Sequence, residues 1–141
     1  RRMLERGNEF GTTTGRQRRC GWLDLVALRY AARLSGMTQL ALTKLDVLSG
    51  FSEVKLCVAY RDRDGDRLTD FPYHQTVFHG CRPEYESLPG WDEDLSECRA
   101  LEDLPPRARE YVDAIADAVE VPITLIGTGQ GRHQVIDQVG V

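Results

Sequence analysis

The sequence predicts an α/β fold in which a mixed or parallel β-sheet carries flanking helices. Two short apolar runs of buried-strand length, residues 39–43 and 123–126, each lead into a polar loop. Two amphipathic segments, 23–34 and the stretch after Pro105, show the apolar spacing of helices. Strands that alternate with helical patterns are typical of this class, and 141 residues are enough for one domain with a core.

The first half of the chain is expected to contain one helix and two strands. Residues 23–34 predict the helix, and Gly36 is placed to end it. The strand at 39–43 follows, and residues 54–60 predict the next one. Residues 62–66, Asp-Arg-Asp-Gly-Asp, predict a turn of the kind that closes a hairpin. This run resembles a calcium-binding loop but lacks the later ligands and the terminal Glu.

The second half begins with the least regular part of the chain, residues 67–100, which we expect to be extended with one or two strands near Gln75–Phe78. Pro105 and Pro106 lie where a helix begins, and Pro122 lies beyond its end. The strand at 123–126 follows. If it lies parallel to the strand at 39–43, both of their polar loops meet at the sheet edge where ligands bind in α/β proteins.

Charge and composition exclude several classes of protein. The chain has 18 Lys and Arg against 22 Asp and Glu, yet residues 1–19 carry six Arg and two Glu. A basic patch on an acidic protein indicates a local anionic ligand and opposes binding to nucleic acid or to a membrane surface. No apolar run approaches the ~20 residues of a membrane span. The four Cys and three His lack metal-ligand spacing, so we expect free thiols, a cytoplasmic location and no metal site in this chain.

The most informative stretch is Thr12-Thr13-Thr14-Gly15-Arg16-Gln17-Arg18-Arg19, between Gly11 and Gly21. Hydroxyl groups and backbone N–H groups bind carboxylate or phosphate oxygens, and Arg binds them in a bidentate way. The stretch predicts a flexible loop that captures an anion. A solvated basic loop without a ligand is the alternative.

The two strand-end loops suggest a purine site. The carboxylate of Asp46 can accept two hydrogen bonds from the adjacent ring N–H and amino group of guanine, which adenine does not offer. The Lys44 stem can cover the base while its ammonium stays in water, and the glycines of Gly127-Thr128-Gly129 allow close approach of backbone groups. A surface ion pair is the alternative for a Lys-x-Asp match this short.

Four segments, in order and over nearly the whole chain, resemble the adenylosuccinate synthetase family. Residues 11–24 are similar to its substrate loop, and residues 43–48, Thr-Lys-Leu-Asp-Val-Leu, to its guanine-recognition segment. Residues 85–91 resemble its proline-glycine-tryptophan stretch. Residues 126–129, followed by Arg132, fall where the family closes the nucleotide pocket.

The resemblance implies a GTP-dependent ligase that joins L-aspartate to inosine monophosphate (IMP) and forms adenylosuccinate, GDP and phosphate in AMP synthesis. It implies an aspartate loop made of Thr12, Thr13, Thr14, Gly15, Arg16, Gln17 and Arg18. Arg16 would also contact IMP, and Arg18 would approach GTP. The GTP-binding residues would further include Lys44, Leu45, Asp46, Gly127, Thr128 and Gly129.

The resemblance also implies what these residues lack. Residues 1–141 would be the C-terminal part of a P-loop-GTPase-like domain, without the half that carries the phosphate loop, the Mg²⁺ ligands and the acid–base residues. No phosphate-loop motif occurs in this sequence. We therefore expect no catalytic residue here, an inactive isolated chain, and a homodimeric full-length parent protein. The sequence departs from the family pattern at two places. Gln17 is expected to alter the stiffness of the loop. Gly131-Arg132-His133 differs from the family's residues, which leaves the role of Arg132 open.

Two other functions fit parts of the sequence. A non-catalytic guanine-nucleotide-binding or scaffold module could have derived from the same enzyme. Binding of single-stranded nucleic acid by the Arg loop is opposed by the overall acidity and by the lack of aromatic residues between the arginines.

Overall fold

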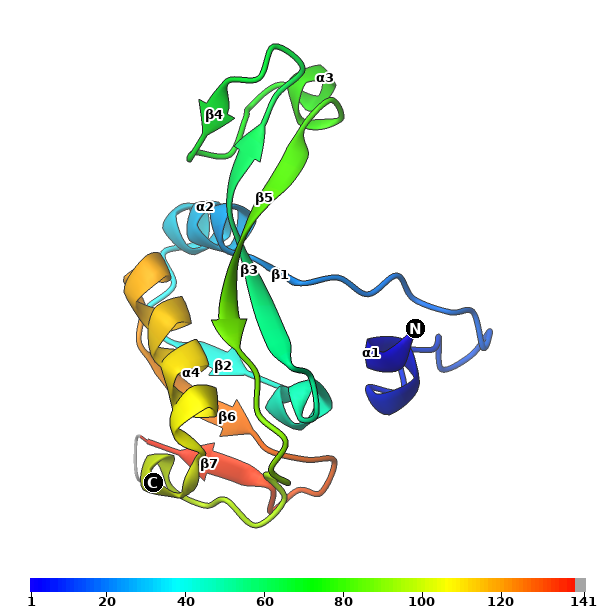
Figure 1. The fold of residues 1–141 in the computed structure, drawn as a ribbon, viewed down its shortest axis with the longest axis vertical. Helices are drawn as coiled ribbons and strands as arrows, with labels where there is room; N and C mark the ends of the chain where they lie inside the picture. Colours follow the sequence, from blue (N-terminus) through cyan, green and yellow to red (C-terminus); the bar gives the residue numbers. More distant parts are fainter. Residues whose placement is uncertain (139–141) are drawn as a thin grey trace.

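The computed structural model describes residues 1–138, which form two small β-sheets, packed helices and an N-terminal arm (Figure 1). The first sheet consists of β1 (Leu23–Asp24), β3 (Glu53–Arg61), β4 (Arg67–Leu68) and β5 (Arg82–Pro89). The second consists of β2 (Leu40–Leu42), β6 (Ile123–Gly127) and β7 (Val135–Asp137). The α-helices are α1 (Arg2–Arg6), α2 (Leu25–Ser35), α3 (Gln75–Phe78) and α4 (Pro106–Val119), and the 3₁₀ turns are η1 (Leu45–Leu48) and η2 (Leu101–Asp103). The α/β class predicted from the sequence is confirmed.

The two strands that lead into the polar loops are parallel neighbours, which is the condition under which the sequence places both loops at one sheet edge. β2 pairs with β6 in parallel, and β7 pairs with the other edge of β6 in antiparallel. At the carboxyl end of this pair the chains approach closely. A Cβ added to Gly127 would lie 3.4 Å from the Cα of Thr43 and 3.5 Å from the backbone nitrogen of Lys44. The sheet therefore brings the two predicted loops side by side.

Asp24 fixes the start of α2. Its Oδ1 accepts a hydrogen bond from the N–H of Ala27 at 3.0 Å, the usual capping contact, and its Oδ2 accepts the hydroxyl of Tyr60 at 2.6 Å. Burial, together with this hydrogen bond, raises the pKa of Tyr60. The predicted helix at 23–34 was two residues too long at its start, because Leu23 and Asp24 pair in parallel with β3. Its end at Gly36, in the left-handed region at φ 59°, was predicted correctly.

The strands expected near Gln75–Phe78 are wrong, because that segment forms α3. The strand lies later, as β5, which pairs with β3 in a long antiparallel hairpin (Figure 1). β5 includes Pro83 and Pro89 and, within residues 1–138, pairs only with β3. A proline has no N–H for a strand ladder but is tolerated on an edge strand, which is why the prolines misled the sequence interpretation. The turn at 62–66 was predicted correctly and joins β3 to β4.

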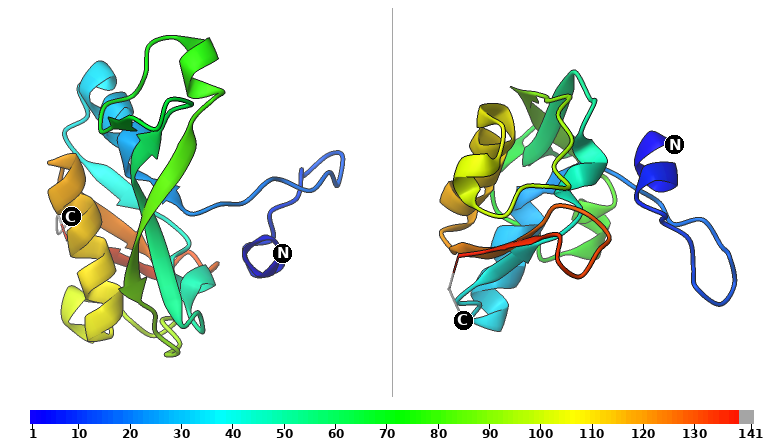
Figure 2. Two further views of the ribbon diagram at one scale, coloured as in Figure 1. Left: turned by 45° about the horizontal axis from the view of Figure 1, so that its top comes forward. Right: turned by 90° about the horizontal axis from the view of Figure 1, so that it is seen from below.

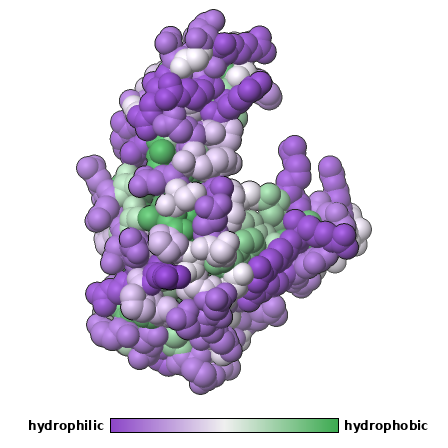
Figure 3. Space-filling view, viewed as in Figure 1, coloured by the Kyte–Doolittle hydropathy of each residue, from purple (hydrophilic) through white to green (hydrophobic). Residues whose placement is uncertain are grey.

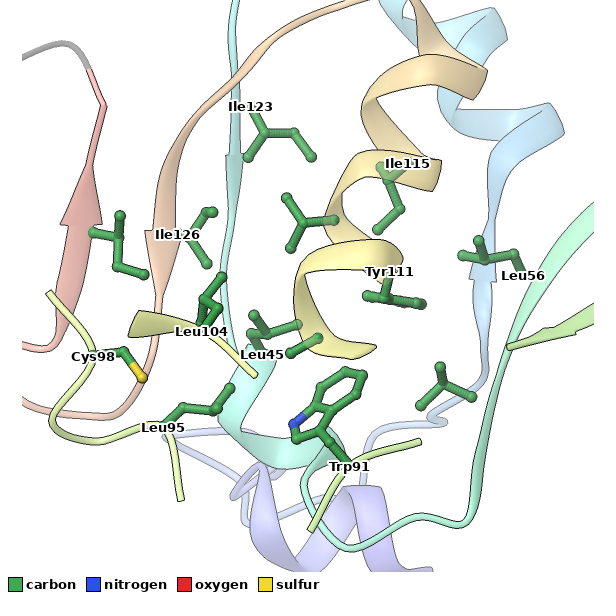
Figure 4. Packing of buried hydrophobic residues seen from close by; sticks show 14 of the residues in the cluster. Leu45, Leu56, Trp91, Leu95, Cys98, Leu104, Tyr111, Ile115, Ile123 and Ile126 are labelled. Atoms are coloured by element: carbon green, nitrogen blue, oxygen red, sulfur yellow. The ribbon is translucent and has the colours of Figure 1, made fainter. Parts of the chain in front are cut away.

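The main core lies between α4 and the two sheets (Figure 4). The helix begins at Pro106 as predicted and buries an apolar stripe that consists of Ala108, Tyr111, Val112, Ile115 and Val119. Leu45 and Trp91 are buried in the same cluster, and the Trp91 ring lies 5.9 Å from that of Tyr111. The 3₁₀ turn η1, which carries Asp46, is therefore anchored in the core through Leu45.

The N-terminal arm leaves the body of the molecule. Residues 7–22 form a long loop that projects sideways, and α1 lies beside η1 (Figure 2).

Most of the face seen in Figure 3 is hydrophilic, including the tip of the β3–β5 hairpin. No helix within residues 1–138 is long and apolar enough to cross a membrane. All four cysteines are free thiols, as predicted, and burial raises the pKa of Cys57 to about 11.

Candidate functional site

The predicted anion loop is a tight hairpin on the N-terminal arm. Phe10 and Gln17 form an antiparallel bridge. The N–H of Gly11 donates to the carbonyl of Arg16 at 2.8 Å, and the N–H of Gly15 donates to the carbonyl of Gly11 at the same distance. Gly15 adopts φ +64°, a conformation that favours glycine. The threonines therefore lie at a defined tip.

The side chains at this tip are exposed and mostly uncommitted. Thr12, Thr13 and Arg16 make no side-chain hydrogen bond or ion pair with residues 1–138, whereas the Thr14 hydroxyl accepts the N–H of Arg16 at 3.3 Å. Free hydroxyls and a free guanidinium on one short hairpin are suited to a ligand with carboxylate groups. The loop predicted from the sequence thus has the internal hydrogen bonds of a hairpin.

Arg18 lies at the base of the hairpin and faces the strand-end loops. Its guanidinium Nη1 is 3.2 Å from Glu9 Oε2, and the ammonium of Lys44 pairs with the other oxygen, Oε1, of the same carboxylate. Lys44 also donates to the carbonyl of Gly7 at 2.8 Å. The hydrogen bond from Lys44 and the charge of Arg18 hold the pKa of Glu9 below its ordinary value. The structure thus brings the side chains of Arg18 and Lys44, two of the predicted GTP-binding residues, together at the carboxylate of Glu9.

Asp46 lies in the wall of a cavity of about 250 Å³ between the arm and the strand ends. Its carboxylate makes no hydrogen bond or ion pair within residues 1–138, although its backbone carbonyl accepts a hydrogen bond from Arg6 Nη2 at 3.3 Å. The cavity is lined by Arg6, Gly7, Asn8, Lys44, Asp46, Val47, Gly129 and Gln130. An unpaired carboxylate is therefore available to a ligand that offers hydrogen-bond donors.

A larger cavity, of about 540 Å³, also has Asp46 in its lining. Asp92 and Asp94 from the chain after β5 share its lining with Arg2 and Arg6 from α1. The N–H and hydroxyl of Ser96 donate to Asp94 and hold its pKa low. The Asp94 carboxylate is therefore already satisfied, unlike that of Asp46.

Two of the predicted guanine-site residues have buried side chains. Leu45 is buried in the core and lines neither cavity. Thr128 is fully buried, with its hydroxyl 3.5 Å from the carbonyl oxygen of Cys98, and it contributes to the lining of the 540 Å³ cavity. Gly127 lies against Thr43 and Lys44, and Gly129 lines the 250 Å³ cavity. Arg132, whose role the sequence left open, is exposed and lines none of the cavities described here.

The sequence interpretation missed the arm residues that complete this site, above all Glu9. Glu9 lies 35 positions before Lys44, and no local spacing reveals that their side chains meet. A weak signal was present in the sequence, because Gly7 and Asn8 both tolerate left-handed backbone conformations just before Glu9. In the structure Asn8 does adopt a left-handed φ of 49°.

The proline-glycine-tryptophan stretch, Pro89-Gly90-Trp91, braces the turn that carries Asp46. The indole N–H of Trp91 donates to the Ser49 hydroxyl at 3.1 Å, and Ser49 follows η1 directly. The N–H of Gly90 donates to the carbonyl of Ser52 at 2.9 Å. Arg6 and Arg2 both donate to the carbonyl of Ser49. The stretch therefore has a structural role that supports the site.

Lys44 should store backbone strain at the site, because it adopts φ 63°, ψ 33° without being a glycine. We expect Lys44→Gly to be more stable than Lys44→Ala by about 1 kcal/mol, since both remove the ammonium and only glycine relieves the strain. Urea unfolding of the two variants measures the difference. Thr43→Gly and Thr43→Ala form the matched control, in which alanine should be the more stable. A Lys44→Ala variant as stable as Lys44→Gly would show that no strain is stored.

Comparisons with known proteins agree on one family. The family model for adenylosuccinate synthetase matches residues 1–136. Adenylosuccinate synthetase from Halothermothrix orenii is 54% identical over 136 residues, which cover 96% of this chain and 31% of that protein. The Acidothermus cellulolyticus protein of the same name is 55% identical over 130 residues, with 92% and 30% covered. The chain thus spans about a third of the length of the curated relatives that it matches.

The fold of this chain is also similar to that of a solved structure from the same family. A fully ligated adenylosuccinate synthetase from Plasmodium falciparum superposes with a TM-score of 0.91 at 40% sequence identity, over 96% of this chain and 33% of that one. The family match extends over nearly all described residues, including the arm, the strand-end loops and the bracing stretch. The chain therefore belongs to the adenylosuccinate synthetase family.

Proposed function

We propose that this chain supplies the aspartate loop and the guanine-binding edge of a GTP-dependent ligase that joins L-aspartate to IMP to form adenylosuccinate. It would do so as the C-terminal portion of a homodimeric parent protein about as long as its relatives. The parent would bind IMP, L-aspartate and GTP. The observation that carries this proposal is the unpaired carboxylate of Asp46 in a cavity shared with Lys44 and Gly129.

The cavity suits a guanine base. Its volume of about 250 Å³ is slightly below the roughly 300–1,000 Å³ of pockets that hold whole drug-sized ligands. A planar base fits this size better than an entire nucleotide. Asp46 would accept the ring N–H and the amino group, and the backbone of Gly129 would approach the base. The site would therefore select guanine over adenine.

The hairpin loop would hold the aspartate substrate. Its two carboxylates require several donors, and Thr12, Thr13 and Arg16 present uncommitted ones on one tip. Arg18, at the base of the hairpin, pairs with the same carboxylate as Lys44 and would therefore lie toward the nucleotide. This arrangement would orient the aspartate amine toward IMP while GTP is bound nearby.

In the reaction that the family scheme implies, GTP phosphorylates the 6-oxygen of IMP, and the aspartate amine then displaces that phosphate. The residues of this chain would position aspartate and GTP, and fixed guanidinium groups would stabilise the negative charge that develops on oxygen. We assign no proton transfer to any of them. The family implies Mg²⁺, and we propose that its ligands lie in the half of the parent protein that carries the phosphate loop. Within residues 1–138 no group of three or more His, Cys, Asp and Glu side chains is arranged to hold a metal ion.

Replacement of Arg16 tests the proposed aspartate loop. In the full-length parent, we expect Arg16→Leu to raise the KM for aspartate about tenfold or more, because charge-assisted hydrogen bonds to a carboxylate are lost. Steady-state kinetics with varied aspartate measures this change. Arg82→Leu, an exposed arginine on β5, is the matched control and should leave the KM unchanged. An unchanged aspartate KM together with an unchanged kcat in Arg16→Leu would remove Arg16 from the site.

A further inference from the structure

Glu9 is placed where the two halves of the proposed site meet. It follows Asn8 at the start of the hairpin loop, and its side chain is 22% exposed. The backbone fixes it at both ends, because its N–H donates to the carbonyl of Leu4 and its carbonyl accepts the N–H of Arg18, both at 2.9 Å. The position of its carboxylate therefore follows from the backbone of the arm.

One carboxylate binds two cations that come from different parts of the fold. Oε2 accepts from Arg18, which ends the hairpin loop, and Oε1 accepts from Lys44, which follows β2. Arg18 and Lys44 are 26 positions apart in the sequence and share no element. Without the negative charge between them, these two like charges would repel each other. Glu9 therefore determines the distance between them.

Stability of the fold does not account for this arrangement. Exposed ion pairs contribute little to folding, and the side chains of Arg18 and Lys44 are about half exposed or more. All three side chains line one cavity of about 340 Å³, together with Arg19 and Cys20. An equivalent double ion pair occurs on the β3–β5 hairpin, where Glu84 bridges Arg61 and Arg67. Because Glu84 does not line this cavity, it provides a comparison for Glu9.

We propose that Glu9 is a positioning residue, which holds Arg18 and Lys44 side by side so that the aspartate loop and the guanine-binding edge bind their ligands as one unit. This inference rests on the proposed function, because it gives the two cations roles in binding GTP. It goes beyond that function by assigning a role to a residue that need not contact any substrate. Its predicted consequence is that loss of the carboxylate weakens the binding of both GTP and aspartate while the chemical step is largely retained.

The test uses the full-length parent with the substitution Glu9→Gln, which keeps the size of the side chain and removes its charge. We expect the KM values for GTP and for aspartate to rise about fivefold each, with kcat changed less than about threefold. Glu84→Gln removes an equivalent double ion pair and should change neither KM. If Glu9→Gln does not fold, Glu9→Asp replaces it. That side chain is too short to reach both cations, so a smaller rise in both KM values is expected.

A second measurement separates positioning from a general structural effect. If Glu9 acts through Lys44, the effect of Glu9→Gln on the KM for GTP should shrink to less than about twofold in a Lys44→Met background. KM values in Glu9→Gln equal to those in Glu84→Gln, a lower KM for GTP, or full additivity with Lys44→Met would each overturn the inference. Absence of GTP-dependent adenylosuccinate formation by the unsubstituted parent would instead overturn the proposed function.

Discussion

Asp46→Asn in the full-length parent should reduce the preference for GTP over xanthosine triphosphate about 100-fold. The carboxylate can accept both the ring N–H and the amino group of guanine, and a charged hydrogen-bonding group lost from such a site has a large effect. Xanthine carries an oxygen where guanine has its amino group, and the Asn amide can donate to that oxygen. The ratio of kcat/KM for the two nucleotides measures the change.

The control for this experiment is Asp92→Asn. Asp92 is exposed and lines the 540 Å³ cavity beside Asp46, but it does not line the 250 Å³ cavity. Its substitution should leave the nucleotide preference unchanged, which excludes a general effect of lowered negative charge. If Asp46→Asn retains the preference for GTP, guanine is recognised elsewhere and the 250 Å³ cavity is not the base site. A shift in Asp92→Asn instead would move the base to the larger cavity.

The parts of the site that the sequence could predict are those that depend on local patterns. The apolar runs that became β2 and β6, and the polar residues that follow them, placed Lys44, Asp46 and Gly129 at one sheet edge. This worked because the carboxyl ends of adjacent parallel strands must lie together. The helix α4 was predicted for a similar reason, since Pro106 and the apolar stripe behind it are local signals.

The parts that the sequence could not predict depend on contacts between distant residues. Nothing near Glu9 indicates that it meets Lys44, and nothing near Leu45 indicates that its side chain enters the core while that of Asp46 faces a cavity. The β5 strand was missed because prolines disfavour a strand unless it lies at the edge of a sheet. Only the tertiary structure, in which β5 pairs with β3 alone within residues 1–138, shows that β5 is such an edge strand. Tertiary context decided each of these positions.

Gly90→Ala should destabilise the protein by about 3 kcal/mol, the largest stability effect expected from a methyl group added at any glycine within residues 1–138. A Cβ at Gly90 would overlap the carbonyl group of Phe51, with its carbonyl carbon only 2.7 Å away, and would lie 3.0 Å from the carbonyl carbon of Ser52. These are backbone atoms, which cannot rotate away as a side chain would, so the strand ends must separate. The free energy of urea unfolding measures the loss.

Gly21→Ala is the matched control, because no atom lies within 4 Å of a Cβ added there and its φ is not positive. That variant should be as stable as the original chain or more stable by about 0.5 kcal/mol. Separation of the strand ends at Gly90 would also disturb the contact between Trp91 and Ser49 and, through η1, the position of Asp46. In the full-length parent, folded Gly90→Ala should therefore show a raised KM for GTP as well. If Gly90→Ala lost stability but kept its GTP affinity, the proline-glycine-tryptophan stretch would support the core and not the nucleotide site.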